Sequence, residues 1–340
     1  FISIDDNEQA NLKKICDEVF GAMNFVECLP VVRSANGLGS KMGFSTNHDY
    51  ILVYKKEILK NKTFLGMKPS DEYIDRFNKE DRYGKYKIDG LFRKKGQGAK
   101  REESPGCFYP IYYNQKTGEV FLEKQANLIE IFPKLPNGGD GRWVWSKDFA
   151  KDKMFRIYAS EGGTIYLKDY WKDDLRQKPR SDFSKTTYLT DMATNELTSL
   201  FGEKLFSTPK PVGLLFDLLD NLLDKNDIVL DFFAGSSTTA HAVMQLNAED
   251  GGNRKFIMVQ LPEKTDEKSE AFKAGYKSIA EISKERIRRA GKKIIEDNAN
   301  KEGIENLDIG FRVLKIDSTN MKDVYYTPDA LKQADMLDLA

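Results

Sequence analysis

Residues 227–260 constrain the fold of this chain more than any other segment. They contain an apolar run at 228–230, an acidic residue at Asp231, a turn of small residues around Gly235, and a helix that opens near Thr238. A short apolar run of this kind is typical of a buried parallel strand. A strand, a tight turn and a helix in this order form a ligand pocket at the carboxyl end of a sheet. Free N–H groups at the start of the helix favour a carboxylate or a phosphate.

The turn differs from the dinucleotide-binding fingerprint, which needs three glycines, because only Gly235 is present here. The sequence Asp-Phe-Phe-Ala-Gly-Ser-Ser-Thr-Thr-Ala at 231–240 instead resembles the S-adenosylmethionine loop of amino-group DNA methyltransferases. Those families usually have glycine where this chain has Ser237. The alternative interpretation is an ordinary strand-to-helix turn of an α/β domain.

Composition excludes several classes of protein. The 340 residues carry 53 basic and 53 acidic side chains, so net charge does not indicate nucleic acid and any basic surface must be local. Three cysteines and two histidines without metal spacing predict no metal site. There is no signal peptide and no apolar run near the roughly 20 residues of a membrane helix. We expect a cytoplasmic, reducing setting and no membrane partner.

The pattern before and after residues 55–185 is that of an α/β core. A strand at 1–4 and a helix ending at Gly21 precede two strands, 24–33 and 50–54, which predict an antiparallel hairpin. Lys210 lies between two prolines at the start of another helix, where it can pair with a carboxylate or simply face solvent. A strand at 256–261, a long helical stretch at 265–299 and a last strand at 310–316 follow.

Residues 55 to about 185 have weaker periodicity, more aromatics and a basic window. Its cations are Lys85, Lys87, Arg93, Lys94, Lys95, Lys100 and Arg101, and Arg142 follows in an Arg-Trp-Val-Trp run. Cations neutralise phosphates and aromatic rings stack on bases, so the window is a candidate DNA contact. Without further context a solvated surface loop is the commoner fate of a charge run, and Arg142 could simply stack on Trp143.

Taken in order, these motifs resemble the modification subunit of type III restriction–modification systems, a beta-class adenine DNA methyltransferase. The resemblance covers nearly the whole chain. It implies an α/β fold, namely a Rossmann-like S-adenosylmethionine-dependent methyltransferase sheet with circularly permuted motif order and an inserted mixed α+β target-recognition domain. Residues 1–54 would be the C-terminal part of the catalytic half, 55–185 the target-recognition domain, 186–316 the cofactor-binding half, and 317–340 a tail.

The resemblance also implies roles for individual residues. Lys210 would meet the methionine carboxylate of S-adenosylmethionine, and Gln260 or Glu263 would take the ribose. The loop residues that would bind the cofactor are Asp231, Phe232, Ala234, Gly235, Ser236, Thr238 and Thr239. The basic window then favours DNA contact, and the implied partners are double-stranded DNA, a second copy in a homodimer, and a helicase–nuclease restriction subunit.

One family feature is missing from the sequence. The catalytic Asp-Pro-Pro-Tyr motif, which positions a flipped adenine, appears nowhere in residues 1–340. Its strand would lie between the strands at 228–230 and 1–4, so we expect an upstream segment to complete the sheet. The chain is then an adenine methyltransferase that is inactive without that segment. The alternatives are a non-catalytic DNA-recognition and assembly module that binds cofactor, and a nucleotide-dependent oxidoreductase, against which the single glycine argues.

Overall fold

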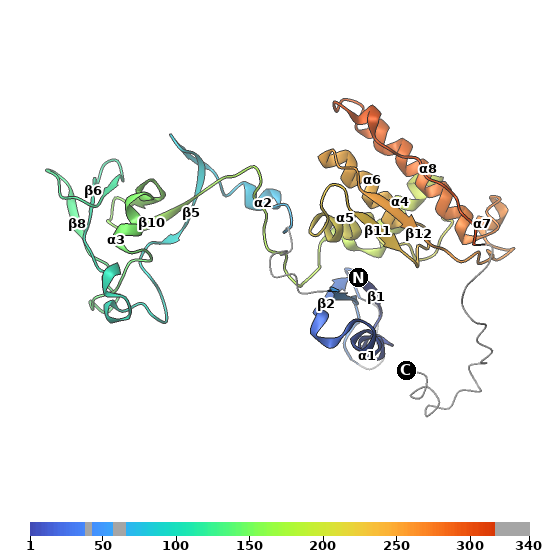
Figure 1. Cartoon of the computed structure of the whole chain (residues 1–340), viewed down its shortest axis with the longest axis horizontal. Helices are drawn as coiled ribbons and strands as arrows, with labels where there is room; N and C mark the ends of the chain where they lie inside the picture. The colour runs from blue at the N-terminus through green and yellow to red at the C-terminus, as the bar shows by residue number, and fades with distance from the viewer. Residues whose placement is uncertain (38–42, 57–65, 317–340) are drawn as a thin grey trace. The chain divides into compact units, whose positions relative to one another are not determined.

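The computed structural model describes residues 1–37, 43–56 and 66–316, and it divides into two compact units. The first unit contains Phe1–Met192 and Lys210–Asp224, and the second contains Ala193–Pro209 and the chain from Lys225 onward. The tail expected at 317–340 lies outside the described residues. Figure 1 shows the elements of both units.

The predicted hairpin forms the core of the first unit. Strands β2 (Phe25–Val32) and β3 (His48–Tyr54) pair antiparallel, and β1 (Ile2–Ile4) pairs antiparallel with the other side of β3. Helix α1 (Gln9–Phe20) ends at Gly21, whose φ of 86° is easily reached only by glycine. Alternate residues of the strands pack against helix α5 (Val212–Asp220) and the turn η5 (Thr186–Tyr188); this cluster contains Leu29, Val31, Ile51, Val53, Phe183, Tyr188, Leu214 and Leu218.

The segment between Gly66 and Lys178, which we call the inserted segment, contains two small antiparallel sheets. One has the order β4 (Lys79–Asp81), β5 (Gly84–Leu91), β10 (Ile165–Tyr170), β9 (Ile157–Ala159). The other has the order β7 (Val120–Phe121), β6 (Ile111–Tyr113), β8 (Ile129–Ile131). The remaining elements are short: α2 (Asp71–Ile74), η2 (Arg101–Glu103), η3 (Pro105–Cys107), α3 (Lys147–Lys151) and η4 (Met154–Arg156).

Aromatic side chains fill the core of the inserted segment. Trp143 of the Arg-Trp-Val-Trp run is buried, stacks on Phe92 with ring centroids 5.3 Å apart, and donates its indole N–H to the Tyr109 carbonyl at 2.8 Å. A buried indole needs such an acceptor, because an unpaired N–H would be costly. Trp143 is therefore a core residue of the inserted segment.

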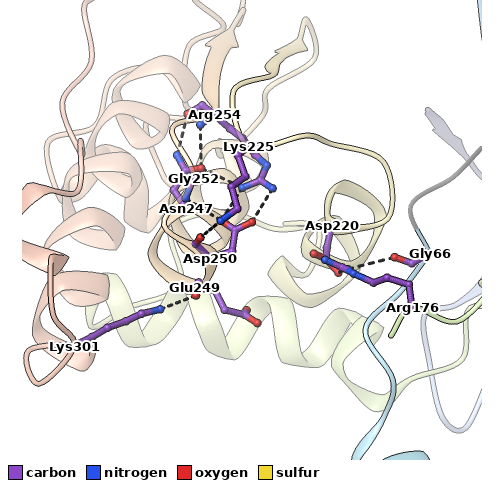
Figure 2. A network of polar contacts seen from close by, with 10 residues as sticks. All are labelled: Gly66, Arg176, Asp220, Lys225, Asn247, Glu249, Asp250, Gly252, Arg254 and Lys301. Atoms are coloured by element: carbon purple, nitrogen blue, oxygen red, sulfur yellow. Dashed lines mark hydrogen bonds and ion pairs between the residues drawn. The ribbon is translucent and has the colours of Figure 1, made fainter. Parts of the chain in front are cut away.

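The two ends of the inserted segment are tied to each other. Met67 and Gln177 exchange backbone hydrogen bonds of 2.8 and 2.9 Å, and Arg176 donates to the Gly66 carbonyl at 3.3 Å. The same guanidinium donates to the buried carboxylate of Asp220, at the end of α5, at 2.5 Å (Figure 2). The chain thus enters and leaves the inserted segment at one place.

The second unit is built on two parallel strands, β11 (Ile228–Asp231) and β12 (Lys255–Met258). Helices α6 (Thr238–Asp250) and α8 (Ile279–Asp297) lie beside each other in Figure 1 and share a core with Phe256 and Met258 of β12. Most of α4 (Thr190–Phe201) also belongs to this unit. The residues of β11 and β12 that alternate with these core positions face outward: Ile228, Leu230 and Ile257 are 62%, 58% and 52% exposed.

Two sequence expectations in this unit are wrong. The helical stretch at 265–299 is broken, because α7 (Glu270–Lys273) ends before Gly275, whose φ is 93°, and α8 starts only at Ile279. The expected strand at 310–316 is extended chain that pairs with no described strand. Only Phe311, with Leu307 and Ile309 just before the stretch, packs on the α6–α8 core, whereas Val313, Leu314 and Ile316 are exposed. Between α8 and residue 317, the turn η6 (Ile304–Asn306) is the only further element of the described chain.

A polar network fixes the chain between α6 and β12. Arg254 is buried and forms two 2.9 Å hydrogen bonds with the carboxylate of Asp250, while Asn247 bonds the backbone of Arg254 in both directions at 2.9 and 3.0 Å (Figure 2). Burial alone would raise the pKa of the Asp250 carboxyl, but Arg254, Lys225 and a backbone N–H outweigh it, so the pKa lies below its usual value. This network sets where β12 begins, and hence where its carboxyl end meets the loop after β11.

Candidate functional site

The loop formed by residues 231–239 joins β11 to α6 at the carboxyl ends of both strands. Ala234 donates its N–H to the Val259 carbonyl at 3.1 Å, and Ser237 donates to Ala234 at 2.6 Å, so the loop folds back over the end of β12. Gly235 has φ 52° and Ser237 has φ 60°, both in the left-handed region. The pocket position predicted from sequence, at the carboxyl end of two parallel strands, is therefore the position of this loop.

Side chains on the strand side hold the loop in this shape. Asp231 accepts from the Thr239 hydroxyl at 2.6 Å and from the Phe233 N–H at 3.1 Å. The Gln260 amide oxygen accepts the Gly235 N–H at 2.7 Å, and its amide nitrogen donates to the Leu261 carbonyl at 3.2 Å. Gln260 is thus engaged with the loop, whereas Glu263 after the same strand is exposed.

The hydroxyl groups of the loop turn toward helix α8. Ser236 and Thr238 are buried, and both accept hydrogen bonds from the guanidinium of Arg286, at 2.8 and 2.6 Å. The Ser283 hydroxyl donates to the Gly235 carbonyl. Phe232 and Phe233 have the opposite orientation and are exposed, with ring centroids 4.9 Å apart.

Two buried titratable groups lie beside the loop. Burial lowers the pKa of the Arg286 guanidinium to about 10, so it remains a cation at neutral pH. Burial, with a contribution from Arg286, lowers the pKa of His241 to about 3, so the imidazole is neutral. Behind the hydroxyl groups of the loop there is thus one buried cation, Arg286, beside a neutral imidazole.

Lys210 belongs to the first unit, at the start of α5. Its ammonium lies 3.4 Å from the carboxylate of Asp49, which also pairs with Arg33 at 3.2 Å. The lysine keeps about half its side chain exposed, at 47%. The sequence expected a carboxylate partner for Lys210, and in this unit that partner is Asp49.

The structure brings four residues of the basic window beside Arg142 in the inserted segment. Two antiparallel bridges, between Arg93 and Trp143 and between Lys100 and Gly141, form a short interrupted ladder in which both ends of residues 93–101 lie beside 140–143. Lys94 donates its N–H to the Arg142 carbonyl at 3.0 Å, and the Arg142 guanidinium donates to the Gly98 carbonyl at 2.5 Å. This ladder, with Lys95 exposed in its turn, places the following cations together: Arg93, Lys94, Lys95, Lys100 and Arg142.

Other members of the window have different environments. Lys87, on β5, is only 5% exposed and pairs with Asp169 at 3.0 Å and Asp89 at 3.2 Å. Its ammonium is occupied inside the fold, so it is removed from the DNA-contact set. Arg101 pairs with Asp140 at 3.1 Å, and its guanidinium lies over the Phe108 ring. Lys85 is exposed on β5, where its strand partner is Glu80 of β4 and no residue of the ladder.

Sequence reasoning missed Ser283 and Arg286. Both lie on the buried face of α8, with Ile282 and Ile287, and only the presence of a charged side chain on an otherwise apolar face marked the position. The apolar periodicity of a helix does not predict which loop packs against its buried face.

Metal and membrane features are absent from the described chain. Across residues 1–37, 43–56 and 66–316, no three His, Cys, Asp or Glu side chains gather as a metal-binding group. In the same ranges, every helix is too short or too polar to cross a membrane.

Comparison with known proteins gives the family. A sequence model for DNA methylases (N6_N4_Mtase) matches residues 1–290. The chain is 39% identical to the type II methyltransferase M.KpnI of Klebsiella pneumoniae over 84% of this chain and 67% of that protein. It is 38% identical to the EcoPI Mod subunit of a type III restriction–modification enzyme from Escherichia phage P1, over 92% of this chain and 49% of that subunit.

A further Mod subunit, StyLTI of Salmonella typhimurium, is 35% identical over 92% of this chain and 44% of its own length. The chain thus spans about half the length of the type III subunits that it matches. The family match covers both units and the inserted segment, and it includes the loop at 231–239. The chain therefore belongs to the DNA methylase family.

Proposed function

We propose that this protein transfers a methyl group from S-adenosylmethionine to the exocyclic amino group of adenine in DNA, as the modification subunit of a type III restriction–modification system. The observation that carries the proposal is the loop at 231–239. It lies at the carboxyl ends of two parallel strands, has buried small residues, and occurs in a chain of the DNA methylase family. Such a position suits a cofactor with a charged amino-acid end.

In this proposal the loop, Lys210 and Glu263 each bind a different part of the cofactor. The loop at Asp231, Phe232, Ala234, Gly235, Ser236, Thr238 and Thr239 surrounds the methionine half, and Lys210 meets its carboxylate. Glu263, which is exposed beyond β12, accepts from the ribose hydroxyls. Gln260 acts through its hydrogen bond to Gly235, so it shapes the loop.

The groups that face adenine are proposed to come from a segment outside residues 1–340. Within the described chain β11 is hydrogen-bonded to β12 alone, and its outward residues Ile228 and Leu230 are exposed. A strand added beside β11 would use its free backbone groups and supply the missing Asp-Pro-Pro-Tyr motif. The adenine nitrogen would then attack the sulfonium methyl in line, with the protein acting mainly by positioning.

The DNA is proposed to contact the inserted segment along the ladder of Arg93, Lys94, Lys95, Lys100 and Arg142. Clustered cations beside aromatic residues are suited to phosphates and bases. Two relatives carry the name of type III Mod subunits, which supports a restriction subunit as a further partner. We also propose a homodimer, and a cytoplasmic location in keeping with three free cysteines.

A methyl-transfer assay on the full-length protein tests the proposal. Tritiated S-adenosylmethionine and unmodified DNA should give N6-methyladenine after digestion to nucleosides. Lys210→Ala should lower transfer, whereas Lys268→Ala, which replaces an exposed lysine outside the proposed site, should not. Cofactor binding with no transfer to DNA would favour the non-catalytic module, and N4-methylcytosine would refute the choice of base.

A further inference from the structure

Arg286 occupies an unusual position behind the loop. It lies in the middle of α8, has no exposed surface, and is among the largest fully buried side chains of the described residues. One of its terminal nitrogens, Nη1, donates to both Ser236 and Thr238, and Ser283, one turn earlier, donates to the Gly235 carbonyl. Two side chains of one helix thus hold three positions of the loop.

The charge of Arg286 is not neutralised by an ion pair within the described residues. Its Nε and Nη2 have no hydrogen-bond partner within residues 1–37, 43–56 and 66–316, and Glu196 contributes a Coulombic attraction. A buried cation without a paired anion is costly to maintain. The cost is increased here by the start of α6, since the N-terminal end of a helix is also positive.

A purely structural brace would not need this charge. Two hydroxyl groups can be held by a neutral donor without desolvating a guanidinium. A buried positive charge that persists behind a loop is explained more simply if an anion reaches the front of that loop and offsets it. The N–H groups in the first turn of α6 have no acceptor within the helix, and they also favour an anion.

We propose that Arg286 is a positioning residue that holds Ser236 and Thr238 inward and gives the loop a preference for the carboxylate end of its ligand. The inference rests on the proposed function, because the ligand considered is S-adenosylmethionine or its product. Arg286 acts through the loop and does not touch the ligand.

The test compares two ligands that differ in the amino-acid end. S-adenosylhomocysteine carries the carboxylate, and 5′-methylthioadenosine lacks the whole amino-acid end. Affinities are measured by calorimetry on the full-length protein with Arg286→Met, with Arg286→Lys, and with Arg288→Met as the matched control, since Arg288 is on the same helix but half exposed. Hydrogen exchange of α6 reports whether the loop and helix remain folded.

Arg286→Met should weaken S-adenosylhomocysteine by roughly tenfold, the order expected for one partly screened charge. It should change 5′-methylthioadenosine by less than about twofold if only the carboxylate end is affected. Arg288→Met should change neither. A buried lysine loses its proton more readily than arginine, so Arg286→Lys should lose affinity for S-adenosylhomocysteine, relative to wild type, as the pH rises.

Three results would overturn the inference. Unchanged affinity of Arg286→Met for S-adenosylhomocysteine would show that the charge is irrelevant to binding. Equal weakening of both ligands would show that the arginine only keeps the loop folded. If the wild-type protein binds neither ligand, the cofactor assignment fails first, and that failure is separate because it involves no variant.

Discussion

Replacing Ser237 by glycine should stabilise the second unit. Ser237 has φ 60° and ψ 41°, a left-handed conformation that costs a residue with a Cβ roughly 1–2 kcal/mol. The residue is 0% exposed, and within the described residues its hydroxyl has no hydrogen-bond partner, which costs about 1–3 kcal/mol more.

Glycine removes both costs and adds two smaller ones. The unfolded chain gains freedom worth about 0.4–1 kcal/mol, and burial of one carbon, worth about 0.8 kcal/mol, is lost. The expected net effect of Ser237→Gly is a stabilisation of about 1–2 kcal/mol. Ser237→Ala removes only the hydroxyl, and Ser237→Val should be destabilising, because a β-branched residue fits the left-handed region poorly.

The assay must report on the second unit alone. All three tryptophans lie in the first unit, so their fluorescence would not report the change. Hydrogen exchange of α6, followed by mass spectrometry, measures the local opening free energy. A stabilisation of about 1–2 kcal/mol slows exchange roughly five- to thirtyfold. Faster exchange in Ser237→Gly than in wild type, or protection in Ser237→Val, would refute the reasoning from backbone strain.

Three further predictions concern pH, packing and DNA. Burial holds the pKa of His241 at about 3 in the folded protein, below its ordinary 6.5, so the unfolded chain binds the extra proton and stability should fall as the pH drops from 6.5 toward 3. Urea titrations should show a slope of at most about 1.4 kcal/mol per pH unit that His241→Gln flattens, and an unchanged slope would contradict the burial. A Cβ on Gly291 would lie 2.8 Å from the Ile309 Cβ, so Gly291→Ala should cost about 1–3 kcal/mol in thermal melts, and Ile309→Ala should relieve part of that cost. Lys95→Ala should lower the salt dependence of DNA binding by about one counterion, whereas Lys87→Met should lower stability and leave the salt slope unchanged; equal slopes for Lys95→Ala and wild type would remove Lys95 from the interface.

The parts of the fold predictable from sequence are those fixed by neighbours along the chain. The apolar run before Asp231 and the small residues around Gly235 are enough to place a strand, a turn and a helix. The hairpin that includes β3 follows from two apolar runs in the same way. These elements depend on local geometry, which a single sequence carries.

The remaining features depend on contacts between distant residues. Lys87 and Lys95 lie in the same basic window, yet Lys87 is buried because β5 pairs with β10, which brings Asp169 to its ammonium from 82 residues along the chain. Arg286 meets Ser236 across 50 residues, and no spacing rule connects them. The chain at 310–316 has the apolar residues of a strand, but only Phe311 packs on the core between α6 and α8, and Val313, Leu314 and Ile316 are exposed. Periodicity predicts which face of an element is buried, but only the tertiary structure shows which other element packs against that face.

The joined ends of the inserted segment have a consequence for how such a protein can change its target. Met67 and Gln177 are hydrogen-bonded to each other, and Arg176 bonds both Gly66 and Asp220 of α5. The two ends of the segment therefore lie together, so that the segment could be replaced as a whole. A different segment with the same two ends could be grafted at residues 66 and 178 while β1–β3 and the second unit keep their own contacts. Under the proposed function, chimaeras cut at these two positions, with Arg176 and Asp220 retained, should exchange the recognised DNA sequence and keep methyl transfer.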